Sequence, residues 1–256
     1  MSIKRWKSQQ ITLFLTLIGL LFGGLGILKP LVTPGVASAI PLSSSRFLLA
    51  KFTLPSKGAP GDRRDAGTRN PFCSSEEVIA LVPATNLGLT VAERPKFWFY
   101  VPYSENRELE AEFSLTDKNN NEVYKQTFSL TDIPGIVSIS LPETVSPLEV
   151  EQLYSWRFSV ICNPNHEKNV LVSGGVERVP MNFTLKSQLE GKNSRESIAV
   201  YAENGLWFDA LTTLAELRRA DFQDKALNDD WVELLQQVNL TEINDKPLVE
   251  CCTAGF

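Results

Sequence analysis

Hydrophobic and polar side chains alternate most clearly along residues 153–162. Tyr154, Trp156 and Phe158 occupy alternate positions, and serine or arginine stands between them. Because successive side chains of a β-strand point to opposite faces, this period of two predicts a strand with one face in a hydrophobic core. The segment ends at Cys162, which makes it a candidate anchor for a disulfide.

Similar strand patterns recur at short intervals between residues 78 and 180. The aromatic run 96–102 is bracketed by Pro95 and Pro102, and two alternating segments flank a polar turn, as in a β-hairpin. The predicted strands besides 153–162 are 78–83, 96–102, 108–115, 122–130, 136–141 and 169–179. No helical pattern separates them, so we predict a mainly β fold. Its domain is one antiparallel immunoglobulin-like β-sandwich at residues 73–186.

The pattern changes after residue 186. A polar linker at 187–195 is followed by hydrophobic residues that recur every three or four positions, which predicts amphipathic helices. The predicted helices are 196–204, 207–220 and 225–239. Together they form a small C-terminal α-helical appendage at 196–240, a helical hairpin plus a third helix, before a tail at 241–256. We expect these helices to pack on each other or on the sandwich.

The N-terminal residues have the features of an export signal. Three of the first seven residues are basic, an apolar run extends from Ile11 to Leu28, and small residues surround Ala39. This order predicts a signal peptide at residues 1–39 that is cleaved after Ala39, and therefore a periplasmic or extracellular protein. The alternative is an uncleaved membrane anchor, because the apolar run is long enough to span a bilayer.

Net charge narrows the classes of partner. Four of the 25 basic residues and none of the 30 acidic residues lie in 1–39, which leaves 21 basic residues and a net charge of −9. Affinity for nucleic acid comes largely from neutralising phosphates with basic residues, so we expect no nucleic-acid partner. The acidic exterior also disfavours anionic lipid, so we expect membrane contact only through an uncleaved signal segment.

The segment 40–72 contains several prolines and glycines and is predicted to be flexible. Arg63, Arg64 and Arg69 cluster in it ahead of Cys73. A solvated linker is the favoured interpretation, and an anion-binding loop is the alternative.

Four cysteines remain after the predicted cleavage: Cys73, Cys162, Cys251 and Cys252. An even number in an exported chain favours disulfides, and we predict the pair Cys73–Cys162. We do not expect the adjacent Cys251 and Cys252 to bond to each other, because so small a ring is strained. They would bridge another chain, stay free or exchange into the first pair. A metal site would require C-x-x-C spacings and histidines, which the sequence does not contain.

Five runs occur together in this chain: 61–73, 95–102, 154–162, 174–179 and 201–214. Together they resemble the cyanobacterial exported family known as domain of unknown function 928, over roughly residues 60–240. The resemblance implies an exported address and a cyanobacterial source. It transfers no catalytic or binding residue.

Sequence motifs for catalysis are missing. His166 is the only histidine, and no nucleophile elbow, phosphate-binding glycine loop or zinc-protease motif is present. Asp117, Asn119 and Asn121 resemble the start of a calcium loop, but Glu122 stands where that loop requires glycine, so we predict a hairpin turn. We therefore predict no catalytic residue, no cofactor and no metal.

Three functional hypotheses follow. The first is a non-enzymatic envelope module that binds a protein partner through an aromatic helical surface formed by Trp207, Phe208 and Trp231. The second is a glycan-binding sandwich that holds polysaccharide on Trp98 or Tyr103. The third is a hydrolase, for which the sequence offers no recognisable motif.

Overall fold

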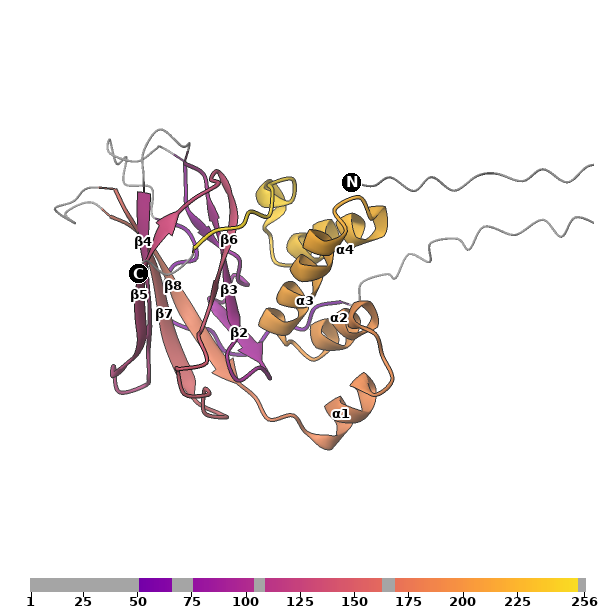
Figure 1. The fold of residues 1–256 in the computed structure, drawn as a ribbon. Coiled ribbons are helices and arrows are strands. Elements are labelled where there is room, and N and C mark those ends of the chain that lie inside the picture. Colours follow the sequence, from indigo (N-terminus) through magenta and orange to yellow (C-terminus); the bar gives the residue numbers. More distant parts are fainter. Residues whose placement is uncertain (1–50, 66–75, 104–108, 163–168, 253–256) are drawn as a thin grey trace, which may run out of the picture. The chain divides into compact units, whose positions relative to one another are not determined.

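The computed structural model describes residues 51–65, 76–103, 109–162 and 169–252. They belong to one compact unit, in which strands are followed by C-terminal helices (Figure 1). The mainly β fold with helices toward the C-terminus is therefore confirmed. The predicted signal peptide with Ala39, and also Cys73 and His166, lie outside the described residues.

Eight strands form two sheets in the described part of the chain. β1 (Ile79–Ala80), β3 (Lys96–Val101) and β6 (Gly135–Ser140) form a three-stranded antiparallel sheet in the order β1-β3-β6. The second sheet has the order β2-β8-β7-β4-β5, with β2 (Leu87–Thr90), β4 (Leu109–Thr116), β5 (Glu122–Leu130), β7 (Leu153–Ile161) and β8 (Val170–Arg178).

The prediction of wholly antiparallel strands is wrong at β2, which runs parallel to β8. Sequence analysis also missed β2 itself. A strand of only four residues with Gly88 inside it gives too short an alternation to be recognised.

The inner faces of the two sheets pack through aromatic rings. Phe99 of β3 stacks on Phe158 of β7 with ring centroids 4.1 Å apart. Phe97 lies 4.8 Å from Phe113 of β4. In β7 the alternating residues predicted to be inside, among them Trp156, are buried, which confirms the period-two prediction.

Four helices and a short 3-10 turn follow the strands. They are α1 (Phe183–Leu189), α2 (Ser194–Glu203), α3 (Trp207–Ala220), α4 (Lys225–Gln237) and η1 (Thr241–Ile243). The three predicted helices are confirmed to within two residues at each end. α1 was not predicted, because it begins within the segment assigned to the sandwich and continues into the supposed linker.

The helices and sheets share a single core. The indole nitrogen of Trp207, the first residue of α3, donates a hydrogen bond of 2.7 Å to the Leu81 carbonyl beside β1. Phe208 lies edge-on to Phe97 of β3 at 5.2 Å. The expectation that the helices pack on each other or on the strands is therefore met. The two sheets and the helices share one hydrophobic core within one compact unit.

Residues 51–65, predicted to be flexible, pack against this core. Phe52 is only 4% exposed. Arg63 donates hydrogen bonds to the carbonyls of Val82 (2.9 Å) and Val238 (2.8 Å), and so joins the end of α4 to the β1 region. The predicted flexibility of 40–72 stays a prediction, and the Arg63 guanidinium is bound by carbonyls.

The C-terminal residues return to the sheets. Val249 donates a hydrogen bond to the Ile136 carbonyl of β6 at 3.0 Å. The sulfurs of Cys251 and Cys252 form a disulfide, contrary to our expectation for adjacent cysteines. Cys252 lies in the left-handed region, with a φ of 72°.

Candidate functional site

The three aromatic residues predicted to bind a partner are buried. Trp207 and Trp231 are 0% exposed and Phe208 is 2% exposed. Trp231 lies under the Arg218 guanidinium, 4.7 Å from ring centroid to Cζ. The prediction that these rings form an exposed docking surface is therefore wrong. They occupy the apolar faces of α3 and α4 that pack into the shared core.

The aromatic residues proposed for glycan binding are buried as well. Trp98 is 2% exposed and Tyr103 is 4% exposed. The Trp98 indole donates a hydrogen bond of 3.0 Å to the Thr212 hydroxyl of α3, and Arg219 covers the ring at 4.8 Å. Neither ring is free to stack on a sugar, so the proposed platform is wrong.

The hairpin-turn prediction at Asp117 is confirmed. Its carboxylate accepts hydrogen bonds from the backbone amides of Asn119 (2.8 Å) and Asn121 (2.9 Å), and from the Asn121 side chain at 2.8 Å. These bonds close the turn between β4 and β5. Within the described ranges, no group of three or more histidine, cysteine, aspartate or glutamate residues is placed to hold a metal ion.

The predicted pair Cys73–Cys162 stays a prediction. Cys162 is 6% exposed at the end of β7 and is disulfide-bonded. Cys73 lies outside the described residues. In the part of the chain that the structure describes, no helix is both long and apolar enough to span a bilayer.

A groove of about 260 Å³ lies between α3 and the chain that links β2 to β3. We call it the α3 groove. Its β side is formed by residues from Thr90 to Lys96, and its helical side presents Asp209, Thr212, Thr213 and Glu216. These four residues recur at intervals of three or four along α3, so the helix places them on one face.

Asp209 closes one end of the α3 groove. Its Oδ2 accepts a hydrogen bond of 3.1 Å from the Val91 amide, which ties the first turn of α3 to the residues after β2. Burial raises the pKa of Asp209 from 3.8 to about 6, although hydrogen bonds from the Thr90 hydroxyl and from backbone amides lower it. The groove leaves the side chain half-buried while surrounding protein atoms displace much of its hydration.

Glu216 and Lys96 close the other end. The Lys96 ammonium lies 2.6 Å from the Glu216 carboxylate and so links β3 to the third turn of α3. Arg94, on the same side, donates hydrogen bonds to the carbonyls of Val145 (2.7 Å) and Glu143 (3.2 Å). Each charged group of the groove therefore already has a protein partner.

A family model described as Domain of Unknown Function (DUF928) matches residues 60–248. The chain belongs to this family. The match spans every strand and helix described above, so the family resemblance expected from the sequence is confirmed. No curated protein matches the chain.

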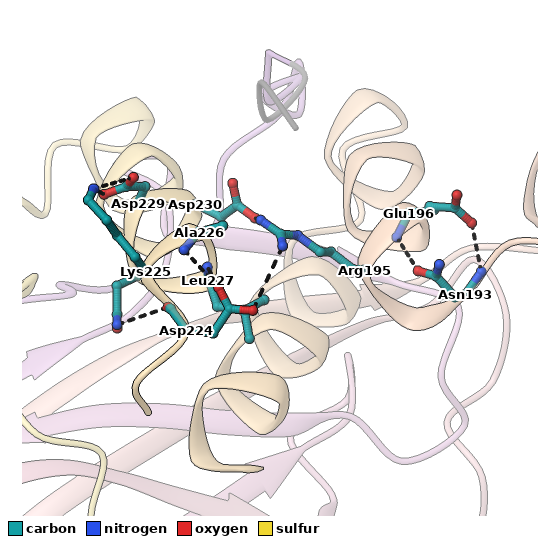
Figure 2. A network of polar contacts seen from close by, with 10 residues as sticks. Asn193, Arg195, Glu196, Asp224, Lys225, Ala226, Leu227, Asp229 and Asp230 are labelled. Atoms are coloured by element: carbon teal, nitrogen blue, oxygen red, sulfur yellow. Dashed lines mark hydrogen bonds and ion pairs between the residues drawn. The ribbon is translucent and has the colours of Figure 1, made fainter. Parts of the chain in front are cut away.

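A second polar cluster in the DUF928 region joins the first turns of α2 and α4 (Figure 2). Arg195 lies 2.9 Å from Asp230 and 3.9 Å from Asp224. Asp224 also caps α4 by accepting hydrogen bonds from the amides of Ala226 (2.7 Å) and Leu227 (3.1 Å). The cluster therefore fixes one helix against the other. We call Arg195, Asp224 and Asp230 the lock between α2 and α4.

Asp230 is the buried member of this lock, with 4% exposure. Burial raises its pKa, and the hydrogen bond and positive charge of Arg195 oppose that rise. A buried carboxylate is retained at low cost only when a cation and hydrogen bonds compensate it, and Arg195 provides both.

Among the residues that the structure describes, the most exposed large hydrophobic side chains lie at the start of α1 and just before α4. Phe183 is 84% exposed and Met181 is 47% exposed, at the start of α1. Leu185, one turn away from them, is buried against Val200 of α2. α1 is thus anchored on α2 by Leu185, while Met181 and Phe183 at its start form an exposed apolar surface, which we call the α1 patch.

Sequence analysis identified neither the α3 groove nor the α1 patch. Asp209 stands in the first turn of a correctly predicted helix, where acidic residues are common because they interact favourably with the helix dipole. Nothing in the sequence distinguishes it from such a residue. The apolar Met181 and Phe183 were a detectable signal, but the adjacent strand pattern assigned them to the end of the sandwich.

Proposed function

We propose that this chain is an exported protein of the cell envelope, periplasmic or extracellular, that acts as a non-enzymatic protein-interaction module. Its two packed sheets would serve as an immunoglobulin-like sandwich, stabilised by a Cys73–Cys162 disulfide. The proposed partner is another envelope protein of the same, cyanobacterial, cell. The proposal no longer uses Trp207, Phe208 and Trp231, because these residues are buried.

The exposure of Phe183 is the observation that carries the proposal. Phe183 is 84% exposed beside the half-exposed Met181. In the isolated protein these exposed apolar side chains lower solubility and contribute no stabilisation by burial. Aromatic residues and methionine are enriched in protein interfaces, where their burial contributes much of the affinity. The α1 patch is therefore the described surface best suited to a partner.

Charge indicates the chemistry of that partner. Lys186 and Lys192 are both exposed within or just after α1, on a chain whose net charge is −5. Lys186 follows Phe183 by three residues in α1, so a partner with an acidic side chain next to an apolar segment matches it. A membrane surface is the competing occupant, and the test below separates the two.

Site-specific photo-crosslinking in the native envelope tests the proposal. The crosslinking residue replaces Phe183 in the tagged full-length protein, and a matched version carries it at Phe222, which is 73% exposed on the turn before α4. We expect a discrete protein adduct from position 183 and none from position 222. A purified partner must then bind the wild type more tightly than Phe183→Ala, and charge reversal at Lys186 must weaken binding further.

Two results would contradict the interaction proposal. One is an adduct pattern shared by both positions, which would reflect only local concentration. The other is crosslinking of position 183 to lipid alone, with loss of vesicle binding in Phe183→Ala, which would make the α1 patch a membrane contact.

The proposed export has its own test. The N-terminus of the protein isolated from its native envelope should begin at Ile40, and non-reducing peptide mapping should recover a peptide pair that links Cys73 to Cys162. An intact N-terminus in the membrane fraction would instead support the uncleaved anchor.

A further inference from the structure

The α3 groove has the form of a ligand site that the proposed partner binding does not use. It is lined by both sheet-linking residues and α3, and it lies on a different part of the chain from the α1 patch. Its volume of about 260 Å³ is near the lower end of the range for small-molecule sites, which begins at roughly 300 Å³. Such a volume is suited to a single small ring.

The charges of the groove disfavour a charged ligand. Lys96 is paired with Glu216 at 2.6 Å, and Arg94 is held by two backbone carbonyls. A cationic ligand would approach these two bases, and an anionic ligand would approach Asp209 and Glu216. Lys96 and Glu216 compensate each other, whereas Arg94 and Asp209 are held by hydrogen bonds. Charges of both signs therefore line the groove, and a ligand of either charge meets repulsion from one of them.

Hydroxyl groups supply the remaining hydrogen-bonding capacity. The Thr212 hydroxyl accepts its bond from Trp98 at 3.0 Å, so its own proton is available for donation into the groove. The half-buried Thr213 hydroxyl has no hydrogen-bond partner among the described residues. Asp209 already accepts from the Thr90 hydroxyl and from backbone amides, including that of Val91, so the two threonine hydroxyls are the groups left for a ligand.

We propose that the α3 groove binds a neutral, hydroxyl-rich ring about the size of one sugar unit, with Thr213 and Thr212 as its principal hydrogen-bonding residues. The ring's hydroxyls would accept from Thr213 and Thr212, while Pro95 and Tyr201 supply apolar contact. This site differs from the Trp98 and Tyr103 platform, whose rings are buried. It is also independent of the α1 patch, so the failure of one proposal leaves the other standing.

Three probes with the same ring and different charge test the proposal on the full mature chain. They are methyl glucoside, which is neutral, glucosamine, which is cationic, and glucuronate, which is anionic. The Thr213 methyl resonance reports binding by NMR, at pH 7.5. We expect a saturable shift with methyl glucoside and affinities at least about threefold weaker for both charged probes.

Thr213→Val removes the hydroxyl and keeps the side-chain shape. Loss of one hydrogen bond predicts roughly a fivefold weaker affinity for methyl glucoside, read from probe saturation transfer so that the variant needs no threonine signal. Thr127→Val, on β5 and outside the groove, is the matched control and should bind as the wild type does. Circular dichroism of both variants verifies that they fold.

The proposal is overturned by any of three results. The neutral probe gives no saturable shift, a charged probe binds more tightly than the neutral one, or folded Thr213→Val binds methyl glucoside as tightly as Thr127→Val does.

Discussion

Asp230 and Asp209 are both enclosed carboxyls on C-terminal helices, and both have a raised pKa, but their surroundings differ. Asp230 lies 2.9 Å from Arg195, within the lock between α2 and α4. Asp209 faces backbone amides and a threonine hydroxyl, at the end of a groove. The first carboxyl has a cation that compensates its burial, and the second has none bonded to it within the described residues.

This difference separates a structural role from a candidate binding role. A structural role accounts for a buried ion pair that joins two helices, because removing either member leaves an uncompensated buried charge. A carboxyl whose burial raises its pKa to about 6 reduces the stability of the folded protein at neutral pH. An asparagine at the same position would offer an acceptor oxygen without this loss of stability. Groups of this kind occur frequently at functional sites.

The largest expected effect is on the lock. Arg195→Met should lower the free energy of unfolding by about 3 kcal/mol, because it leaves Asp230 buried without its cation. Lys225→Met is the matched control, since Lys225 pairs with Asp229 on the surface with 81% exposure and should change stability by less than about 0.5 kcal/mol. Urea unfolding measures both. Equal effects would mean that the lock is no stronger than a surface pair.

The next effect concerns the wall of the α3 groove. A β-carbon at Gly88 would meet the ring of Phe208, which is only 2% exposed. Gly88→Ala should therefore destabilise the protein by roughly 2 kcal/mol through overpacking. The comparison is Gly191→Ala, where a β-carbon meets no atom within 4 Å and only the φ of 71° opposes alanine.

For Gly191→Ala we expect a cost of about 1 kcal/mol from backbone strain alone. A smaller loss in Gly88→Ala than in Gly191→Ala would show that β2 and α3 are not closely packed. The same urea titration measures the two variants.

The third effect depends on pH. The pKa of Asp209 is about 6 in the folded protein and near 3.8 when unfolded, so the folded state binds more protons between these values. This group's contribution to stability is therefore complete below the unfolded value of 3.8 and is lost as the pH rises through about 6, by roughly 3 kcal/mol. Asp209→Asn should remove that loss, so its stability relative to wild type increases from pH 4 to pH 7.

The free energies of unfolding of wild type and Asp209→Asn are measured at pH 4 and pH 7. Subtracting one from the other at each pH removes the contributions of the other titrating groups. A relative stability that does not change with pH would mean that the carboxyl is well solvated and that the contrast with Asp230 is weaker than described.

The smallest expected effect is the pH dependence of stability at Asp117, which has the opposite sign to that at Asp209. Hydrogen bonds from the Asn121 side chain and backbone lower the pKa of Asp117, whose carboxylate lies in the exposed β4–β5 turn. Its stabilising contribution is present above the ordinary value of 3.8 and is lost as the pH falls. Asp117→Asn should thus lose slightly in stability relative to wild type as the pH rises past that value. A gain in the same titration would contradict this assignment.

Local periodicity determined much of this fold in advance. The alternation around Trp156 placed β7 and its buried face, and the three- and four-residue spacing placed α3 at residues 207–220. The Asp117 turn was also predictable, because its side chain bonds to backbone only two and four residues away. Each of these features depends on neighbours close in sequence.

Only the tertiary structure decided which surfaces remain available. An apolar stripe on a helix is the same in sequence whether it faces a sheet or a partner, so Trp207 and Phe208 were mistaken for an exposed surface. The α3 groove brings together Lys96 and Glu216, 120 residues apart, and no local pattern encodes that meeting. Long-range packing chooses among the contacts that local chemistry permits, and for that reason it also decides which residues can act as a site.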